Sequence, residues 1–389
     1  MHSKNPNIPR REGRKIKVAL MSYTMDGRQA KGTALIAHKL IEHILDDDRF
    51  EFTLVHYEKN DDPLYKRARE IVIPHIPHLP FGTRFVRTML FFWKYRKEKF
   101  DIVHWFQPRL YPFFWLVPAK HIVVTAHGGG DAAYPHAFLF SRFVFVGVMK
   151  LFGRYIRATV GDSQFARQEI IDAYGFPPEK VYGILLGGGE DYLPLDKEEA
   201  RKRIESVYGI RSPYILDVSR LEPHKNVGGA IKAYTRAREM GPLPHSLVIV
   251  GYRESDAQNV WGLARDSTSA GRISFINFVK GEDLNALYSA ADLFLFPSLN
   301  EGFGLSIIEA FASGVPIVTS NVTSLPEVAG DAAIIVDPTD TEALALAIRR
   351  VLLDKTLRDA LVRKGIVRAR EFTWKKHAEK TLELYQSIL

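Results

Sequence analysis

The chain has 389 residues, 46% of them hydrophobic and 25% charged, which is the balance of a globular protein long enough for two domains. Because it contains no cysteine, a disulfide framework, a zinc site built on cysteine and a thiol nucleophile are all excluded. Its net charge of +8 comes entirely from residues 1–195, which hold 28 Lys and Arg against 20 Asp and Glu, so an anionic surface or acceptor is an expected partner of this half.

The first 14 residues are polar and basic, and we expect a flexible tail there rather than a signal peptide. No apolar run reaches the roughly 18–20 residues that a membrane-spanning helix needs. We therefore expect a cytoplasmic protein, with a peripheral position on the cytoplasmic face of a membrane as the alternative.

Short runs of β-branched and aromatic residues predict the strands of the first half, at residues 15–23, 50–58, 71–76, 100–107, 121–127, 158–164 and 180–188. A helix is expected from Ala34 to Leu45. Gly32 thus lies at a strand-to-helix junction, where backbone amides favour an anion, although a plain turn is the alternative. Asp46-Asp47-Asp48 fits the D-x-D pattern of metal-dependent transferases, but it follows a helix end, and we expect a solvated turn.

His127 ends the strand at 121–127 and is followed by three glycines. The carboxyl ends of parallel strands are where α/β folds bind ligands, so His127 is a candidate site residue, with a bystander role as the alternative. Asp131, beyond the glycines, is a weaker candidate.

An aromatic and basic segment at residues 81–100 predicts a helix with Phe85, Met89, Phe92 and Trp93 on one face, flanked by Lys and Arg. Residues 111–118 and 138–152 are similarly aromatic. This composition is typical of a helix on an anionic bilayer surface, and the alternative is that these faces pack on the sheet. Nucleic acid is not an expected partner, because no nucleic-acid-binding module is recognisable.

The second half begins after a hinge expected near residues 189–197. Its first strand, at 214–220, is followed by Arg220 and Lys225, two cations that could bind a diphosphate or could simply lie on a solvated loop. Strands are also expected at 247–251 and 273–279. Within the second of these, Asn277 could adopt a positive φ, as glycine does.

The most informative stretch is A-D-L-F-L-F-P-S-L-N-E-G-F-G-L-S-I-I-E-A-F-A-S-G-V-P-I-V-T-S-N, residues 291–321. It predicts a strand, a glycine turn, a helix ending at Gly314 and a second strand, so amides around Gly302, Phe303, Gly304 and Leu305 could bind a diphosphate. Glu301 and Glu309 bracket the turn. Glu309 could reach ribose hydroxyls and Glu301 the group beyond the far phosphate. Alternatively, both acids only favour the positive helix end, by roughly 0.3–1 kcal/mol each.

The C-terminal part is expected to be helical. A helix follows Pro338, beginning at a Thr/Asp cap. A last helix, from Trp374 to Ile388, has one apolar face, made of Trp374, Ala378, Leu382 and Tyr385.

The run at 297–321, continued by S-L-P-E-V-A-G-D-A-A-I-I-V-D-P, resembles the retaining GT-B glycosyltransferases of family 4, in particular the mannosyltransferase-like enzymes (glycosyl transferases group 1). The resemblance implies two doubly wound, Rossmann-like α/β domains facing one another across a cleft. The boundaries we expect are a tail at 1–14, an acceptor-binding domain at 15–192, a nucleotide-sugar-binding domain at 193–372, and a C-terminal helix at 373–389 that crosses back to the first domain.

The resemblance also implies roles for single residues. A glycine loop at Gly32 would close over the donor phosphates, His127 would contact the transferred sugar, and backbone groups near Val279 would contact the base. The catalytic residues expected are Glu301, His127, Arg220 and Lys225. The donor-binding residues expected are Gly32, Arg220, Lys225, Val279, Gly302, Phe303, Gly304, Leu305 and Glu309.

The expected activity is retaining, metal-independent transfer of a hexose from a nucleoside-diphosphate sugar, with GDP-mannose as the first choice. No metal or other cofactor is expected. The acceptor would be a glycan or a lipid-linked glycan in the synthesis of surface polysaccharide or glycolipid. Two alternatives stay open, a nucleotide-sugar epimerase on the same fold and a catalytically silent peripheral membrane protein.

Overall fold

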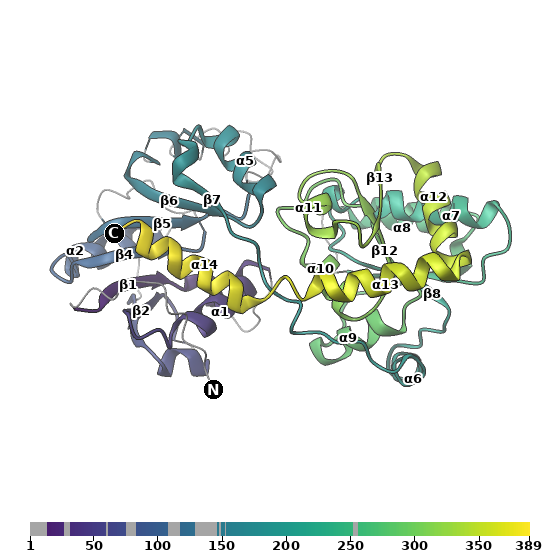
Figure 1. Cartoon of the computed structure of the whole chain (residues 1–389), viewed down its shortest axis with the longest axis horizontal. Coiled ribbons are helices and arrows are strands. Elements are labelled where there is room, and N and C mark those ends of the chain that lie inside the picture. The colour runs from purple at the N-terminus through teal and green to yellow at the C-terminus, as the bar shows by residue number, and fades with distance from the viewer. Residues whose placement is uncertain are drawn as a thin grey trace. The chain divides into compact units, whose positions relative to one another are not determined.

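The computed structural model describes residues 14–26, 32–59, 61–74, 83–107, 117–128, 146–147, 149–151, 153–251 and 256–389 (Figure 1). By their contacts, residues divide into two compact units. Unit 1 comprises residues up to 126, 147–159 and 382–389, and unit 2 comprises 127–146 and 160–381. Asp131 and most of the aromatic segments at 111–118 and 138–152 lie outside the described residues. The domain boundary expected near residue 192 remains a prediction.

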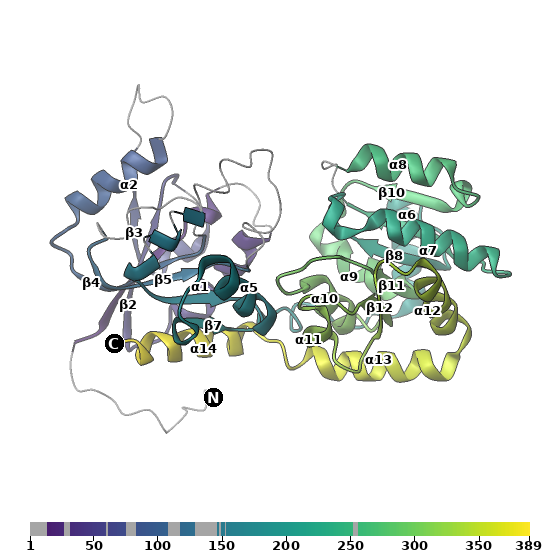
Figure 2. The same ribbon diagram turned by 90° about the horizontal axis from the view of Figure 1, so that it is seen from above.

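The first sheet has seven strands in the order β3-β2-β1-β4-β5-β6-β7. Strand β1 pairs in parallel with both β2 and β4. The strands are β1 (Ile16–Met21), β2 (Phe50–His56), β3 (Arg69–Val72), β4 (Phe100–Trp105), β5 (Ala119–Thr125), β6 (Ile156–Gly161) and β7 (Val181–Gly183). Its helices are α1 (Thr33–Ile44), α2 (Thr83–Lys94) and α5 (Gln164–Tyr174), and α2 lies beside the strands in Figure 2.

The second sheet has six strands in the order β10-β9-β8-β11-β12-β13, and neighbouring strands pair in parallel. The strands are β8 (Tyr214–Val218), β9 (Ser246–Val250), β10 (Ile273–Ile276), β11 (Leu293–Phe296), β12 (Ile317–Ser320) and β13 (Ile334–Val336). Its helices are α6 (Lys197–Tyr208), α7 (Val227–Glu239), α8 (Ala257–Asp266), α9 (Gly281–Ala290), α10 (Leu305–Ala312), α11 (Leu325–Ala329), α12 (Thr341–Leu353) and α13 (Lys355–Ala369). The last helix, α14 (Trp374–Ser387), belongs to unit 2 up to residue 381 and to unit 1 from Leu382.

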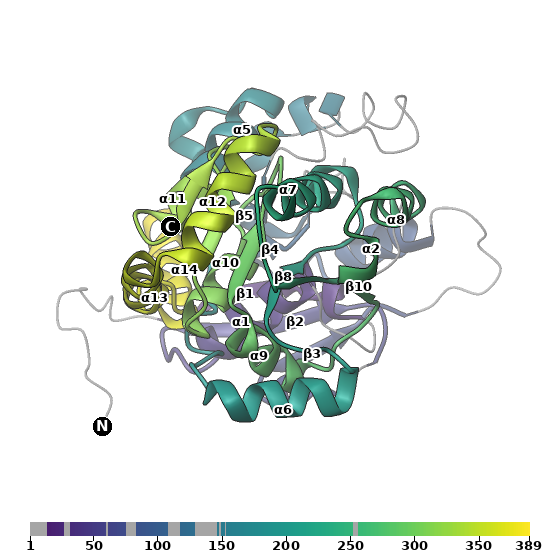
Figure 3. The same ribbon diagram turned by 90° about the vertical axis from the view of Figure 1, so that its right-hand side faces the viewer.

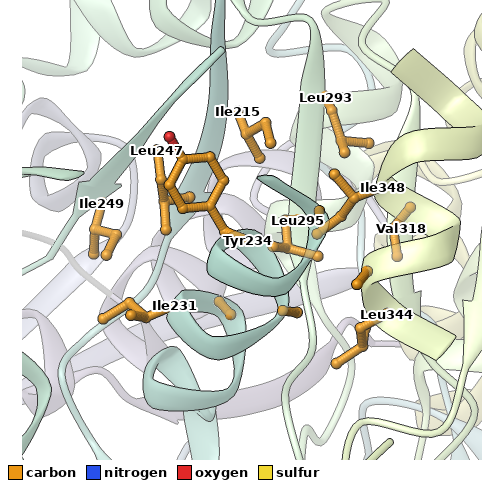
Figure 4. Close-up of a cluster of buried hydrophobic side chains, with 14 of the residues drawn as sticks. Ile215, Ile231, Tyr234, Leu247, Ile249, Leu293, Leu295, Val318, Leu344 and Ile348 are labelled. Atoms are coloured by element: carbon orange, nitrogen blue, oxygen red, sulfur yellow. The ribbon is translucent and has the colours of Figure 1, made fainter. Parts of the chain in front are cut away.

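Helices cover both faces of the second sheet, with α6 and α9 opposite α7 and α12 in Figure 3. The core on the side of α7, α8 and α12 consists of side chains such as Ile215, Tyr234, Leu295 and Ile348, all fully or almost fully buried (Figure 4). Because strands of such a sheet are buried on both faces, they read as continuous apolar runs in the sequence. This explains why L-F-L-F at 293–296 was recognisable as a strand.

Local signals set the ends of several helices as the sequence predicts. The carboxylate of Asp340 accepts a hydrogen bond from the backbone amide of Ala343 (2.9 Å) and caps α12, and Gly314 follows α10 with φ of 75°. The last helix buries its predicted apolar face, and Tyr385 near its end lies with its hydroxyl 2.5 Å from Nδ1 of His104 on β4, both in unit 1. No helix in the described part of the chain is long and apolar enough to cross a membrane.

Candidate active site

The second sheet has a topological switch point between β8 and β11. The strand that follows β8 in sequence, β9, lies on one side of this pair, and the strand that follows β11, β12, lies on the other side. Ligands of open α/β sheets bind at the carboxyl ends of the strands at such a switch point. The loop after β8 carries Arg220 and Lys225, and the loop after β11 carries Glu301 and the glycine turn. The topology therefore brings the predicted cations and the predicted glycine turn to neighbouring strand ends.

Lys225 and Glu301 form a largely buried ion pair. Nζ of Lys225 lies 2.6 Å from Oε1 of Glu301, and the side chains are 17% and 11% exposed. Arg220 is different, because its side chain is 61% exposed and its guanidinium lies 3.1 Å from Oε1 of Glu222. Exposed ion pairs contribute little to stability, so Arg220 can exchange Glu222 for a bound anion at small cost.

Asn226 fixes the backbone beside Lys225. It adopts φ of 54°, which Asn tolerates better than most residues, and its Nδ2 donates to the carbonyl oxygens of Pro297 (3.0 Å) and Pro338 (2.9 Å). The backbone amide of Leu299 donates to the carbonyl of His224 (2.7 Å), which ties the two loops together. The sequence analysis did not identify Asn226, although an Asn directly after the lysine was a signal for a left-handed residue.

The turn at 302–304 requires its glycines. A Cβ on Gly302 would lie 2.3 Å from the carbonyl oxygen of His127, and Gly304 has φ of 101° as the N-cap of α10. The ring of Phe303 is buried and lies 5.7 Å from the ring of Phe372, so this residue can present only its backbone to a ligand. With no side-chain cap on α10, its first backbone amides and the positive helix end suit an anion.

Ser324 stabilises this turn by hydrogen bonds to its backbone carbonyls. Its Oγ lies 2.8 Å from the carbonyl oxygen of Glu301 and 3.0 Å from that of Phe303, and the backbone amide of Glu301 donates to Oγ1 of Thr323 (3.3 Å). The S-L-P-E-V-A-G-D run thus has a physical role in shaping the turn, which the sequence alone did not reveal.

Glu309 lies on α10 and is held by tyrosines. Its Oε2 accepts a hydrogen bond from the hydroxyl of Tyr288 on α9 (2.9 Å), and Tyr288 is fully buried. Burial raises the pKa of Glu309 above its ordinary value, while hydrogen bonds from Tyr288 and Tyr192 oppose the rise. Tyr288 and Tyr192 were missed, because nothing in their local sequence distinguishes them from core tyrosines.

His127 is oriented by a carboxylate. It has φ of 54°, and its Nδ1 lies 3.0 and 3.3 Å from the two oxygens of Asp162, which follows β6. An acceptor on Nδ1 places the proton of the neutral ring there and leaves Nε2 as an acceptor. Ser163 next to it donates through Oγ to the carbonyl of Gly302 (2.7 Å), so within unit 2 the histidine segment and the glycine turn are in contact. Asp162 was not predicted.

Asp217, on β8, is a buried acid that the sequence analysis passed over as part of a strand. Ser219 donates to its Oδ1 (2.5 Å), and its Oδ2 has no hydrogen-bond partner among the described residues. Burial raises the pKa of Asp217 to about 7, against the lowering effects of Ser219 and Lys225. The Asp217 carboxyl group therefore keeps its proton in acidic solution and loses it only around neutral pH.

Two further predicted donor-binding residues, Val279 and Gly32, lie after β10 and at the start of α1. Val279 follows β10 and is buried, while its neighbour Phe278 is 50% exposed. Asn277 keeps a negative φ, so the left-handed turn considered for it does not form. Gly32 has φ of 55° at the start of α1 in unit 1, whereas the other predicted site residues belong to unit 2.

Across the described ranges, no group of three or more His, Asp or Glu side chains is arranged to hold a metal ion. Asp46 is 85% exposed and pairs with Arg67, and Asp47 pairs with Arg49, as in the solvated turn expected for this D-x-D sequence.

Comparison with known proteins gives two family matches. Residues 31–187 match the model of glycosyltransferase family 4, and residues 199–368 match that of glycosyl transferases group 1. The O-antigen chain mannosyltransferase B of Escherichia coli is 35% identical over 226 residues, which are 58% of this chain and 59% of that protein. A D-inositol 3-phosphate glycosyltransferase of Acidothermus cellulolyticus is 31% identical over 233 residues, 57% of this chain and 51% of that protein. The matched region thus spans little more than half of these relatives.

Solved structures extend the likeness over the whole fold. Sucrose-phosphate synthase from Thermosynechococcus elongatus has a TM-score of 0.76 at 20% identity, covering 96% of this chain and 99% of that one. Anabaena HepE in complex with UDP-glucose has a TM-score of 0.71 at 18% identity, covering 96% of this chain and all of that one. These likenesses confirm the predicted class of two doubly wound α/β sheets.

Proposed function

This chain belongs to the GT4-like glycosyltransferases and has the GT-B fold, and we propose that it transfers a hexose from a nucleoside-diphosphate sugar to a glycan or lipid-linked acceptor. GDP-mannose is the proposed donor and surface polysaccharide or glycolipid the product. The similarity to the O-antigen chain mannosyltransferase B of Escherichia coli supports both choices.

The observation that carries the proposal is the meeting of Lys225, Glu301 and the uncapped start of α10 at one switch point. Breaking the bond between the anomeric carbon and the diphosphate leaves negative charge on the departing phosphate. Preorganised donors and cations that meet such charge supply a large part of catalysis. Lys225, Arg220 and the amides at 304–305 would bind the diphosphate, and no metal ion is required in this scheme.

We assign contacts to the ribose, base and sugar of the donor from the hydrogen-bonding groups of each residue. Glu309 would accept hydrogen bonds from the ribose hydroxyls, with the tyrosine hydroxyls holding its carboxylate in place. Backbone groups at Val279 would contact the base. Glu301 and His127 would bind hydroxyls of the transferred sugar.

The proposed reaction retains the anomeric configuration by a front-face route. The bond to the diphosphate breaks, the acceptor oxygen bonds to the anomeric carbon on the same face, and the acceptor proton passes to the departing phosphate oxygen. A covalent glycosyl-enzyme is less suitable, because the strong carboxylate candidate is Glu301, which we assign to hydroxyls of the transferred sugar.

The test is incubation of the protein with GDP-mannose and an oligosaccharide acceptor in the presence of EDTA. We expect a glycoside with the donor's anomeric configuration by NMR, together with free GDP. Loss of all activity in EDTA and its return with a divalent ion would contradict metal independence, and an inverted product would contradict retention.

Two other functions are distinguished by the same reaction. A nucleotide-sugar epimerase on this fold would yield a free epimeric sugar nucleotide or its hydrolysis product without acceptor. A catalytically silent protein would yield neither, although the ordered Lys225–Glu301 pair and the tyrosine-held Glu309 favour a working site.

A further inference from the structure

Helix α2 has a buried inner face. Phe91 and Phe92 are each 4% exposed, and the ring of Phe92 lies 5.6 Å from that of Trp105 on β4. Thr88 is also buried and bonds through its hydroxyl to that of Tyr57 (2.5 Å). One part of the aromatic segment therefore packs on the first sheet.

The outer face of α2 carries two exposed apolar side chains. Leu90 is 50% exposed and Trp93 is 66% exposed, although the sequence analysis placed Trp93 on one face with Phe92. That assignment is wrong, because successive residues of a helix are separated by about 100° and the two rings point apart. Leu90 and Trp93 are instead three residues apart and share a face. Lys94 ends the helix, and Arg96 and Lys97 lie in the turn that follows it.

Cations surround Trp93. The guanidinium of Arg96 lies 4.4 Å from the centre of the Trp93 ring and donates to the Trp93 carbonyl (2.6 Å), so this side chain lies over the exposed indole. Lys94 and Lys97 are both exposed. An exposed Trp ring with a cation on its face and further lysines beside it is the arrangement that suits the interface between lipid headgroups and acyl chains.

No acid of this segment offsets these charges. The sequence holds no Asp or Glu between Glu70 and Glu98, while it holds Arg84, Arg87, Lys94, Arg96 and Lys97. Glu98 is engaged by Arg69 through two bonds of 2.8 and 2.9 Å. Arg87 is buried and donates to backbone carbonyls, whereas Lys94, Arg96 and Lys97 are exposed.

We propose that the outer face of α2 and the turn after it, defined by Leu90, Trp93, Lys94, Arg96 and Lys97, dock on an anionic lipid bilayer. Leu90 and Trp93 enter the headgroup region and the cations contact the lipid phosphates. A soluble polyanion would engage the cations but would gain nothing from Leu90 and Trp93, and a protein partner would leave the acid-free charge pattern unexplained. Docking at α2 does not depend on sugar transfer, so the two proposals can fail separately.

The test is co-sedimentation of the intact protein with vesicles of equimolar phosphatidylglycerol and phosphatidylcholine, and with vesicles of phosphatidylcholine alone. We expect binding to the anionic vesicles and little to the neutral ones. Lys94→Gln/Lys97→Gln should weaken the binding by about 25-fold, since each cation near an anionic leaflet contributes about fivefold. Leu90→Ala/Trp93→Ala should weaken it by at least about tenfold.

A matched control comes from α12 in unit 2, where Leu346 and Leu353 are 55% and 61% exposed. Leu346→Ala/Leu353→Ala should bind vesicles as the unchanged protein does. Lipids brominated in the acyl chain should quench part of the tryptophan fluorescence of the unchanged protein, and Trp93→Phe should lose that part. Melting temperatures of all variants establish that they fold.

Three results would overturn the proposal. The first is equal binding to neutral and anionic vesicles, or none to either. The second is unchanged anionic-vesicle binding in folded Leu90→Ala/Trp93→Ala. The third is binding of soluble polyphosphate as tight as that of vesicles and insensitive to Trp93, which would identify a polyanion site instead.

Discussion

Nζ of Lys225 lies 2.6 Å from Oε1 of Glu301, so a cation and an acid lie together at the switch point of the second sheet. In the proposed function, a diphosphate bound there would exchange one anionic partner of Lys225 for another. Glu301 would then be able to contact the group beyond the phosphate, where the sugar of a donor would lie. The pair would thus serve both a phosphate ligand and a sugar ligand.

Replacing either cation should remove most of the activity. We expect Lys225→Ala and Arg220→Ala each to lower turnover at least about a hundredfold, since charge-assisted hydrogen bonds contribute roughly 1.5–3 kcal/mol apiece and the leaving phosphate gains charge in the transition state. Steady-state rates at saturating donor measure this. The exposed Lys232 on α7 offers a control, and Lys232→Ala should keep normal turnover. Near-normal rates in both site variants would remove the phosphate assignment.

Tyr288 should act through Glu309. Loss of its hydroxyl in Tyr288→Phe removes a hydrogen bond worth about 1–1.5 kcal/mol, so we expect the KM for the donor to rise about fivefold to tenfold while kcat changes little. Glu309→Gln should also raise KM. The unchanged protein should bind a deoxyribose analogue of the donor more weakly than the donor itself. Glu309→Gln should bind the donor and the analogue with similar affinity. Equal discrimination by both proteins would show that Glu309 does not contact the ribose.

Asp162 should act through His127. In Asp162→Asn the amide no longer requires a proton on Nδ1, so the ring loses its fixed tautomer and orientation. We expect kcat to fall about tenfold or more with little change in the donor KM, and Asp162→Glu to restore part of the rate. A rise in KM alone, or a loss of folding in both variants, would mean that the carboxylate serves the fold and not the reaction.

Asp217 should make stability depend on pH in an unusual direction. Its pKa is raised to about 7 by burial, so between about pH 4 and 7 the folded protein keeps a proton that the unfolded chain releases, and stability falls as pH rises through this window. The side chain of the Asp217→Asn variant cannot ionise, so the variant does not lose this stability as the pH rises. The difference in melting temperature between the variant and the unchanged protein should therefore shift in favour of the variant from about pH 5 to 7 and stay constant above that. The corresponding change in the free energy of unfolding is on the order of 2–4 kcal/mol. A difference that is constant with pH would contradict this.

The features of the fold that could be predicted are those set by residues close together in the sequence. Strands such as β11 are continuous apolar runs, the cap at Asp340 and the glycine after α10 mark helix ends, and G-F-G between strand and helix indicates a turn with free amides. Strand β13, only three residues long, was not predicted, because so short a run carries little pattern.

The residues of the candidate site could be predicted only in part from such local signals. Arg220, Lys225, Glu301 and Glu309 stand beside recognisable strand and helix ends, but the groups that orient them do not. Tyr288 reaches Glu309 from another helix, and Asp162 reaches His127 from another strand. Such contacts depend on which strands become neighbours, and the residue types involved are equally common in ordinary cores. The faces of α2 were misassigned for a related reason, since a helix pattern shows which residues share a face but not which face the sheet covers.

The most direct test of the central claim is calorimetric titration, in EDTA, of the unchanged protein and of Arg220→Ala/Lys225→Ala with GDP, UDP and ADP and with the corresponding nucleosides. We predict that one diphosphate binds the unchanged protein, that the double variant loses at least about a hundredfold in affinity for it, and that the matching nucleoside binds both proteins equally weakly. Equal affinity of both proteins for the diphosphate, or no binding of any of the three, would contradict the assignment of this pocket to a nucleoside-diphosphate sugar.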